Sequence, residues 1–496
     1  MNPLLRTKSI DALIAASEEP DKRLRKTLGP WSLTAFGVGA VIGSGIFILT
    51  GTAAAGETLS FKSILHAPVI DLLMHGAQAG STIGRPGAGP GISLSFLLTA
   101  VACSFAALCY AELASMIPIA GSAYTYAYAT LGEIFAWIIG WDLILEYAVS
   151  NMAVAVGFSA YLNSVLEGFG IHLPAVIANP MIAEGRMTGS WFNVPALVVL
   201  LVLTYILVRG VRESSGTNNV MVMIKVAAIL VFVIGASRAV NTANWHPFLP
   251  NGFSGVLTGA AIVFFTYIGF DSVSTAAEEC RKPQRDLPFG IIATLIICAV
   301  LYISVALVLT GIANYKTLNN AAPVANALKV LGYDGIRQWV SLGAIVGMLS
   351  SLLVFQYGQA RVWFAMSRDG LLPRAFSRVH PVHKTPHIST WIAGLAVGIP
   401  AGIWDIGTFA DLANIGTLFA FIVVSAGVIV LRKKQPDRPR GFRAPGSPWL
   451  PALSIVCCLV LMMALPLETW ARFVVWLLIG FAIYFPFGRK RSALAK

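Results

Sequence analysis

The chain has 496 residues, of which 56% are apolar and only 12% are charged. Typical soluble domains carry about twice that charged share, so there are too few charges here to coat the several soluble domains that this length would suggest. A mean hydropathy of +0.74 and many apolar runs longer than about 18 residues indicate a polytopic membrane protein. The net charge of +12 does not indicate a nucleic-acid partner, because the basic residues form short clusters between apolar runs.

The chain begins with a polar segment, 1–30, which is too long and too charged for a cleavable signal peptide. When successive spans are given alternating directions, most Lys and Arg residues fall on the same side of the membrane as this segment. We therefore expect both ends, including a tail at 488–496, in the cytoplasm. The membrane is expected to be the inner (plasma) membrane. The apolar pattern predicts twelve membrane helices, at about 31–54, 91–115, 133–166, 193–212, 217–237, 253–276, 288–313, 336–366, 388–404, 408–431, 448–466 and 471–487.

One long insertion, 56–90, separates the first two spans on the outer side. It starts with a moderately amphipathic stretch and ends in a Gly/Pro-rich loop from Gly80 to Pro90. We interpret it as a variable surface loop, with a lid or a partner-docking hairpin as the alternative.

The metal-binding residue types do not form a convincing site. Six cysteines lie mostly in or beside apolar segments without a CxxC pair, which favours unpaired thiols over a disulfide framework or a zinc site. His380, His383 and His387 have metal-like spacing, but Pro381 and Pro386 break any helix that would align their rings. We expect no metal.

Two spans contain glycine-rich interruptions. The first reads GVGAVIGSGIF over 37–47, and the sixth reads FFTYIGFDSVSTAAEE over 264–279, with Gly269 inside the run. Such glycines form either close packing faces or true breaks. If residues 31–237 and 253–431 are two five-helix repeats, the two interrupted spans occupy equivalent positions in inverted halves, which points to a binding site at the membrane midplane. Free amides and free carbonyls at such breaks suit a zwitterion, an α-amino acid.

Several motifs in order carry a family resemblance. GAVIGSGIF (39–47), CYAELASMIPIAGSAYTYAY (109–128), GWDLILEY (140–147), FTYIGFDSVSTAAEE (265–279) and ARVWFAMSRDGLLP (360–373) resemble the amino acid-polyamine-organocation transporters, most closely the cationic amino acid transporter branch and its bacterial relatives. The resemblance implies an all-α LeuT-type fold with 5+5 inverted repeats, broken helices 1 and 6, and two further helices within 448–487.

The resemblance also implies a site at the two breaks. Amides at the first break would hold the substrate carboxylate, carbonyls of both breaks would hold the ammonium, and the Phe265 ring would cover the substrate, although a bulky core aromatic is the alternative for that ring. The residues implied are Ile42, Gly43, Ser44, Gly45, Ile46, Phe265 and Ile268.

Charged residues inside the spans point to the coupling ion. Lys225, in VMVMIKVAAILVFV, would cost about 3 kcal/mol at a helix centre, so we interpret it as functional rather than snorkelling. The resemblance implies that it reaches the first break in place of a sodium ion. Glu146, one turn after Asp142, is predicted to contact substrate or a proton, with a structural hydrogen bond as the alternative.

Three further expectations concern the ends of the spans and the substrate. Glu112 and Glu133 are interpreted as interface charges at span ends. Phe355 aligns where animal transporters of cationic amino acids have a small serine, so the pocket is expected to exclude an arginine side chain. This favours small or medium neutral amino acids such as alanine, with cationic ones second.

The sequence is therefore interpreted as a proton-coupled amino acid symporter that works by alternating access, with the proton as coupling ion and no other cofactor. The alternatives are an ion-independent exchanger and a transport-inactive amino acid sensor. An enzyme is not expected, because the spans contain no Ser/His/Asp set and no HExxH motif. Expected partners are the amino acid and the lipid bilayer. The sequence does not decide whether a small membrane partner or a sterol binds near the last two helices.

Overall fold

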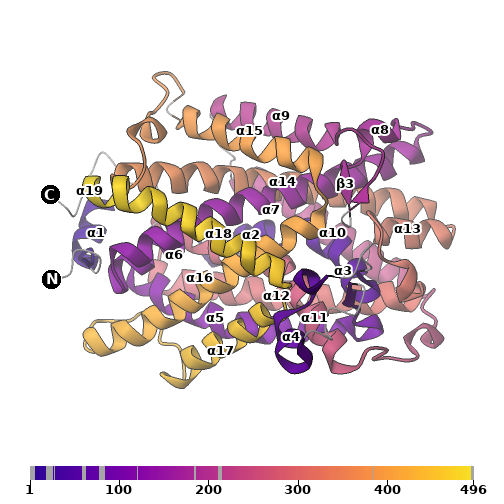
Figure 1. The fold of residues 1–496 in the computed structure, drawn as a ribbon, viewed down its shortest axis with the longest axis horizontal. Coiled ribbons are helices and arrows are strands. Elements are labelled where there is room, and N and C mark those ends of the chain that lie inside the picture. The colour runs from indigo at the N-terminus through magenta and orange to yellow at the C-terminus, as the bar shows by residue number, and fades with distance from the viewer. Residues whose placement is uncertain are drawn as a thin grey trace.

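The computed structural model describes residues 6–17, 26, 28–57, 63–76, 84–119, 121–183, 186–209, 215–383 and 385–492. Long helices run side by side along one axis of an elongated bundle (Figure 1). The N-terminal and C-terminal ends lie at the same end of this bundle, which we call the terminal side; the opposite end is the distal side. Parts of the expected N-terminal segment, insertion and tail fall outside the described residues.

The helices follow the predicted spans closely. Eight of them, together with one bent pair, are long and apolar enough within the described ranges to cross a membrane, and three shorter apolar helices stand at the remaining predicted positions. In chain order they are α2 (Pro30–Val41) with α3 (Gly45–Ala55), α5 (Ile92–Met116), α7 (Glu133–Gly168), α9 (Val194–Arg209), α10 (Ser215–Ser237), α11 (Gly252–Val263) continued by η6 (Phe264–Tyr267) and η7 (Phe270–Glu279), α12 (Pro283–Ile312), α14 (Asp334–Arg368), α15 (His387–Ile403), α16 (Ile406–Lys434), α17 (Trp449–Met463) and α18 (Leu467–Ile483).

Short elements connect the spans. They are α1 (Ile10–Ser17), η2 (Ile64–His66), α4 (Val69–His75), η4 (Gly89–Gly91), α6 (Ser122–Thr130), α8 (Ala175–Ala178), η5 (Thr242–Trp245), η8 (Tyr315–Thr317), α13 (Pro323–Val330), η9 (Arg374–Ser377), η10 (Tyr484–Gly488) and α19 (Arg489–Arg491). The described strands form two small antiparallel pairs, β1 (Gly56–Glu57) with β2 (Arg85–Pro86) and β3 (Ile182–Ala183) with β4 (Arg186–Met187).

The helices pack in pairs that lie five spans apart. α5 packs extensively on α12, α7 on α14 and α9 on α15. These are spans two and seven, three and eight, and four and nine, the pairing expected when two five-helix repeats face each other across a pseudo-twofold axis. α7 lies at the centre of the bundle, and its long run of buried residues contacts α14, α16, α15 and α9.

The outer surface of the bundle is apolar. Ile234 of α10 and Leu478 of α18 are 69% and 60% exposed, and many other large apolar side chains lie open in the same way. Water would not tolerate contiguous apolar surface on this scale, whereas lipid chains cover it without cost. The composition and the exposed apolar faces thus agree on a multi-pass membrane protein.

The insertion is anchored to the bundle rather than lying loose on its surface. The Arg85 guanidinium, 4% exposed, forms ion pairs with Asp411 of α16 (2.9 Å) and with Glu57 (2.7 Å) across the β1–β2 pair. Further along, the Val69 amide donates to the Leu465 carbonyl ahead of α18. The 84–90 end of the insertion is thus fastened to the bundle by a buried arginine, whereas Leu65, Leu73 and Met74 are exposed, and the variability of the loop stays a prediction.

The expectation that Glu112 and Glu133 are interface charges is also wrong, because both are buried. Glu112, 1% exposed, accepts hydrogen bonds from Arg432, Arg440 and the Ala444 amide, so it holds the segment after α16 against α5. The second carboxylate, 3% exposed, accepts from the hydroxyls of Tyr128 and Tyr484, among others. Burial is tolerated because each carboxylate has full partners.

Candidate functional site

The first interrupted span is a true break. α2 ends at Val41, Ile42 is extended (φ −80°, ψ 92°), and α3 restarts at Gly45 with its axis bent by 49°. The Ser44 hydroxyl is buried without a hydrogen-bond partner among the described residues. The start of α3 thus presents first-turn amides, which have no partner within the helix, and the positive end of its dipole.

The amides at this break are not equivalent. The Gly43 amide donates to the Val41 carbonyl (3.0 Å). The resemblance implied that the amides of Gly43, Ser44 and Gly45 hold the substrate carboxylate. Those of Ser44 and Gly45 thus remain available to a ligand in this conformation. The carbonyl of Ile46 accepts from the Thr50 hydroxyl (2.8 Å) inside α3.

The sixth span is broken at the same depth. η6 ends at Tyr267, Ile268 is extended, and Gly269 takes the left-handed conformation (φ 116°) before η7 begins. Only glycine adopts this conformation readily, so the residue that the sequence singled out has a backbone role. The Ile268 amide donates to the Phe265 carbonyl, which leaves that carbonyl partly engaged.

The two breaks contact each other. A β-carbon on Gly269 would lie 3.1 Å from the carbonyl carbon of Ala40, and one on Gly45 would lie 2.8 Å from Cγ2 of Thr266 and 3.2 Å from the Phe265 ring. These glycines therefore permit close approach between the two broken spans. Gly45 thus lies at a true helix break and also forms a close packing face, the two interpretations considered from the sequence.

Tyr302 of α12 joins the breaks. Its hydroxyl lies 3.1 Å from the carbonyl oxygen of Val41 and 2.9 Å from that of Thr266. The role of this tyrosine was not predicted from the sequence, because a tyrosine within an apolar run carries no signal that distinguishes it from a core aromatic. Its partners become visible only when α12 is placed beside both breaks.

Lys225 of α10 reaches the first break, as the resemblance implied. Its ammonium donates to the carbonyls of Gly39 (2.6 Å) and Ile42 (2.9 Å), and the side chain is fully buried. The Ser351 hydroxyl of α14 lies 3.2 Å from the same Ile42 oxygen. The Ile42 carbonyl was expected to hold the substrate ammonium, but in this conformation the lysine and the serine occupy it.

The stem of Lys225 fits because of a glycine opposite it. A β-carbon on Gly347 of α14 would lie 3.2 Å from Cβ of the lysine and 3.5 Å from its Cδ. A larger residue on α14 would therefore displace the lysine from the break. Ser351 follows one turn later, so α14 contributes both the space for the stem and a second hydroxyl at the carbonyls.

Three carboxylates lie buried in the centre of the bundle. Asp142 and Glu146 of α7 and Asp271 of η7 are at most 4% exposed. Glu146 interacts electrostatically with the other two, and Asp271 accepts a hydrogen bond from the Ser122 hydroxyl (3.4 Å). The sequence placed Glu146 near the site, and the fold adds Asp271, which directly follows the second break.

Phe355 lies on α14 one turn after Ser351, the residue that touches the first break. Its ring is 4% exposed and packs at 6.1 Å from the Tyr147 ring of α7. It therefore packs between α7 and α14. The structure brings it to the neighbourhood expected of a side-chain pocket, although its role in selecting substrates stays a prediction.

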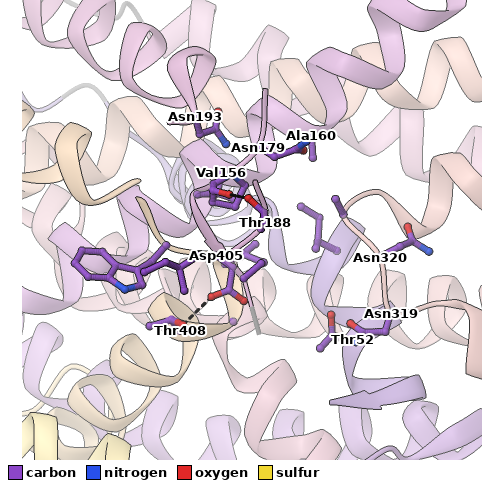
Figure 2. A pocket seen from close by; sticks show the side chains of 18 of the residues that line it. Thr52, Val156, Ala160, Asn179, Thr188, Asn193, Asn319, Asn320, Asp405 and Thr408 are labelled. Carbon is purple, nitrogen blue, oxygen red and sulfur yellow. Dashed lines mark hydrogen bonds between the residues drawn. The ribbon is translucent and has the colours of Figure 1, made fainter. Parts of the chain in front are cut away.

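A cavity of about 890 Å³ opens on the distal side (Figure 2). Its walls include Thr52 of α3, Val156 of α7, Asn319 and Asp405, and it reaches Ile48, about one turn from Gly45. The ion-paired Arg85 and its partners also line it. The lining does not include the described residues 43–45, so this conformation leaves the breaks covered beneath a distal vestibule.

Described residues of the N-terminal segment pack on the terminal side. Lys8 forms an ion pair with Asp369 at the end of α14 (2.8 Å) and lies 4.5 Å from the Tyr128 ring centre. The Leu28 amide donates to the Glu279 carbonyl (2.9 Å) at the end of η7. These contacts cover the ends of α14 and η7, beside a second cavity of about 760 Å³ whose lining includes Ala277 and Glu278.

The histidines do not form a metal site. Within the part of the chain that the structure describes, no group of three or more His, Cys, Asp or Glu side chains is placed to hold a metal ion. The rings of His380, His383 and His387 lie close together, but Nδ1 of His380 accepts hydrogen bonds from the amides of Val382 and His383.

Two broken helices in contact with each other and a buried lysine on the carbonyls of the first break, within a bundle whose outer surface is apolar, are the features of a membrane transporter. The chain belongs to the amino acid permease family, within the amino acid-polyamine-organocation superfamily, since a sequence profile described as "Amino acid permease" matches residues 28–485.

Its relatives have similar lengths. The "Methylthioribose transporter" of Bacillus subtilis is 46% identical over the whole of both chains. The "Branched-chain amino acid permease BcaP" of the same organism is 46% identical over 99% of both. "Cationic amino acid transporter 9, chloroplastic" of Arabidopsis thaliana is 35% identical over 92% of this chain and 76% of its own. The branched-chain and cationic amino acid transporters among these relatives support amino acid transport.

Proposed function

We propose that this protein is a proton-coupled importer of neutral amino acids in the inner membrane, with both termini in the cytoplasm. The observation that carries the proposal is the contact of the Lys225 ammonium with the carbonyls of Gly39 and Ile42. A fixed positive charge at these oxygens would repel a metal cation. We therefore infer that transport is coupled to a change in the protonation of the lysine.

Movement between two groups of helices, each with members from both repeats, would expose the site alternately. We propose that spans one, two, six and seven (α2–α3, α5, α11–η7 and α12) rock against spans three, four, eight and nine (α7, α9, α14 and α15). The tight packing of α5 on α12 and of α7 on α14 supports two bodies that move as units. Lys225, on α10, would then lose its carbonyl partners when the first break moves.

The proposed substrates are small and medium neutral amino acids, including alanine and the branched-chain set. Phe355 supports this, because its buried ring fills space that an arginine side chain would need. The similarity to a branched-chain amino acid permease supports the same class. Cationic amino acids are the second class, since plant cationic transporters are also similar and Glu146 is a buried acidic residue of α7.

The test is uptake of labelled alanine, leucine and arginine into proteoliposomes, with and without an inward pH gradient. Accumulation of alanine or leucine only with the gradient is the expected result. Flux that requires amino acid on the opposite side, and ignores the gradient, would replace symport with exchange. Binding without any flux would favour the sensor.

Methylthioribose is a second candidate substrate, because a transporter named for it is 46% identical over the full length of both chains. Methylthioribose has no α-carboxylate or ammonium, so it would not use the amides of Ser44 and Gly45 as an amino acid would. Competition separates the two. Alanine or leucine uptake that is unaffected by excess methylthioribose supports the amino acid, and uptake of labelled methylthioribose alone would overturn it.

A further inference from the structure

Asp142 of α7 is a buried carboxylate that the site described above does not use. Its side chain is fully buried, and neither carboxylate oxygen has a hydrogen-bond partner among the described residues. The other buried carboxylates of the bundle differ in this respect. Asp411 is held by Arg85, and Glu112 by two arginines and an amide.

The space around Asp142 is shaped by α16. A β-carbon on Gly416 would lie 2.6 Å from the Asp142 Oδ1 atom, which is too close for any side chain. Thr417, the next residue of α16, donates its hydroxyl to the Ala413 carbonyl (3.0 Å). α16 therefore presents a glycine surface to the carboxylate and brings no charge to it.

The other helices around this turn of α7 are apolar or uncharged as well. A β-carbon on Gly140 would touch Met366 of α14 and Tyr124 of α6. Trp141 stacks on Trp476 of α18, with the ring centres 4.5 Å apart. The two α7 residues before Asp142 thus pack against a thioether and aromatic rings.

The charged groups that act on this region are also acidic. Glu146 lies one turn further along α7 and interacts electrostatically with Asp142 and with Asp271 of η7. The nearest cation of the site, Lys225, is bound to the carbonyls of the first break. An ionised carboxylate without a partner costs several kcal/mol in such surroundings, and a second negative charge one turn away adds to that cost. A protonated, neutral carboxyl avoids both costs.

We propose that Asp142 is a second proton-binding residue of the transport cycle, which holds a proton while α7 and α16 are packed together and releases it towards the terminal side when they separate. The inference rests on the proposed proton coupling. In the releasing step the O–H bond of the carboxyl breaks and the proton passes to water, which then solvates the carboxylate.

The position along α7 fits a route for protons. Asp142 is nine residues from Glu133 at the terminal end of α7, or about 14 Å at the helical rise of 1.5 Å per residue. Glu146 lies one turn deeper, next to Asp271 and the second break. The carboxyl at 142 therefore stands between the midplane site and the terminal side, where a proton must leave during import.

The first test reads the protonation state directly. The infrared spectrum of the purified protein at neutral pH should contain the carbonyl stretch of a protonated carboxylic acid, and D142N should remove intensity from that band. D411N is the matched control, because Asp411 is buried but paired with Arg85, so its loss should leave the band unchanged. A band that is identical in the wild type and in D142N would overturn the proposal.

The second test reads coupling in proteoliposomes. D142N should bind substrate, because the residue does not touch either break, but its accumulation driven by a pH gradient should fall at least about tenfold. G416A, which leaves the carboxyl in place but crowds it, should shift the pH dependence of uptake. If D142N does not fold, the infrared comparison is made with G416A, whose band should move.

The outcomes separate this inference from the proposed function. A wild-type protein that ignores the pH gradient would remove proton coupling, and this inference with it. A wild-type protein that responds to the gradient, with D142N and G416A responding equally, would remove only the role of Asp142.

Discussion

The ammonium nitrogen of Lys225 lies 2.6 Å from the carbonyl oxygen of Gly39, inside a break that leaves this oxygen without its helical partner. The lysine thus completes the hydrogen bonding of an unwound segment that lipid could not satisfy. Its charge and the geometry of the first break are linked, so any event that moves α2 or α3 changes the environment of the lysine.

Replacing the lysine should uncouple transport. K225A is expected to reduce alanine accumulation driven by a pH gradient at least about tenfold, because the carbonyls of the break lose their cation. Uptake in proteoliposomes measures this, and calorimetric binding of alanine separates loss of coupling from loss of the site. K316A is the control, since Lys316 is exposed in η8. Full gradient-driven uptake by K225A would refute the proposed role.

Enlarging the pocket should change selectivity. F355S removes a buried ring beside Tyr147 and is expected to admit arginine, so that arginine should compete with alanine at least about tenfold better than in the wild type. F355L, which keeps most of the volume, is the control and should retain the original order of substrates. Unchanged competition by arginine in F355S would show that this position does not line the side-chain pocket.

A methyl group at the contact between the breaks should be harmful. G45A places a β-carbon 2.8 Å from Thr266, and overpacking of this kind costs about 1–3 kcal/mol of stability. We expect a lower thermal midpoint in detergent and slower uptake. G335A, at a helical glycine with nothing within 4 Å, is the matched control and should be neutral or slightly stabilising. Equal midpoints for the two variants would show that the breaks are not in tight contact.

The anchor of the insertion should be needed for stability. R85A leaves Asp411 buried without its cation, and breaking a buried pair in this way costs about 3–5 kcal/mol. Thermal unfolding in detergent measures the loss. K329A removes a pair with Glu167 that is exposed on both sides, so its effect should stay within about 1 kcal/mol. Similar midpoints for R85A and the wild type would mean that the insertion is not held by this pair.

Asp405, just before α16 in the distal vestibule, should contribute to the pH dependence of stability. Burial and the nearby Glu57 raise the pKa of this carboxyl, and the Thr408 hydroxyl opposes the change. A raised pKa means that the folded protein binds the proton more tightly than the unfolded chain, so this group's contribution falls as pH rises above the ordinary carboxyl pKa of about 3.9.

D405N should therefore flatten the decline of the thermal midpoint between acidic and neutral pH. Thermal scans across that range measure the difference from the wild type. D437N, at an exposed aspartate, is the control and should follow the wild-type curve. A decline of the same size in D405N would show that other groups account for it.

The order and approximate length of the membrane helices could be predicted because apolar runs and basic clusters are local properties of the chain. Gly269 could be identified for the same reason, since a glycine inside an apolar run marks a backbone requirement. The burial of Arg85 and Glu112 could not, because Asp411 and Arg432, which pair with them, lie more than 300 residues away in the chain. A charge at the end of a span looks the same in sequence whether it faces water or a distant arginine.

The sequence by itself determined the membrane class, the twelve helices, the two interrupted spans and the lysine as an unusual charge, because each is written in the composition or spacing of adjacent residues. Only the tertiary structure decided which oxygens that lysine binds, that Tyr302 joins the two breaks, and that Asp142 is left without a partner against Gly416. Such facts depend on which helices meet and at what height, and packing across the whole bundle determines that.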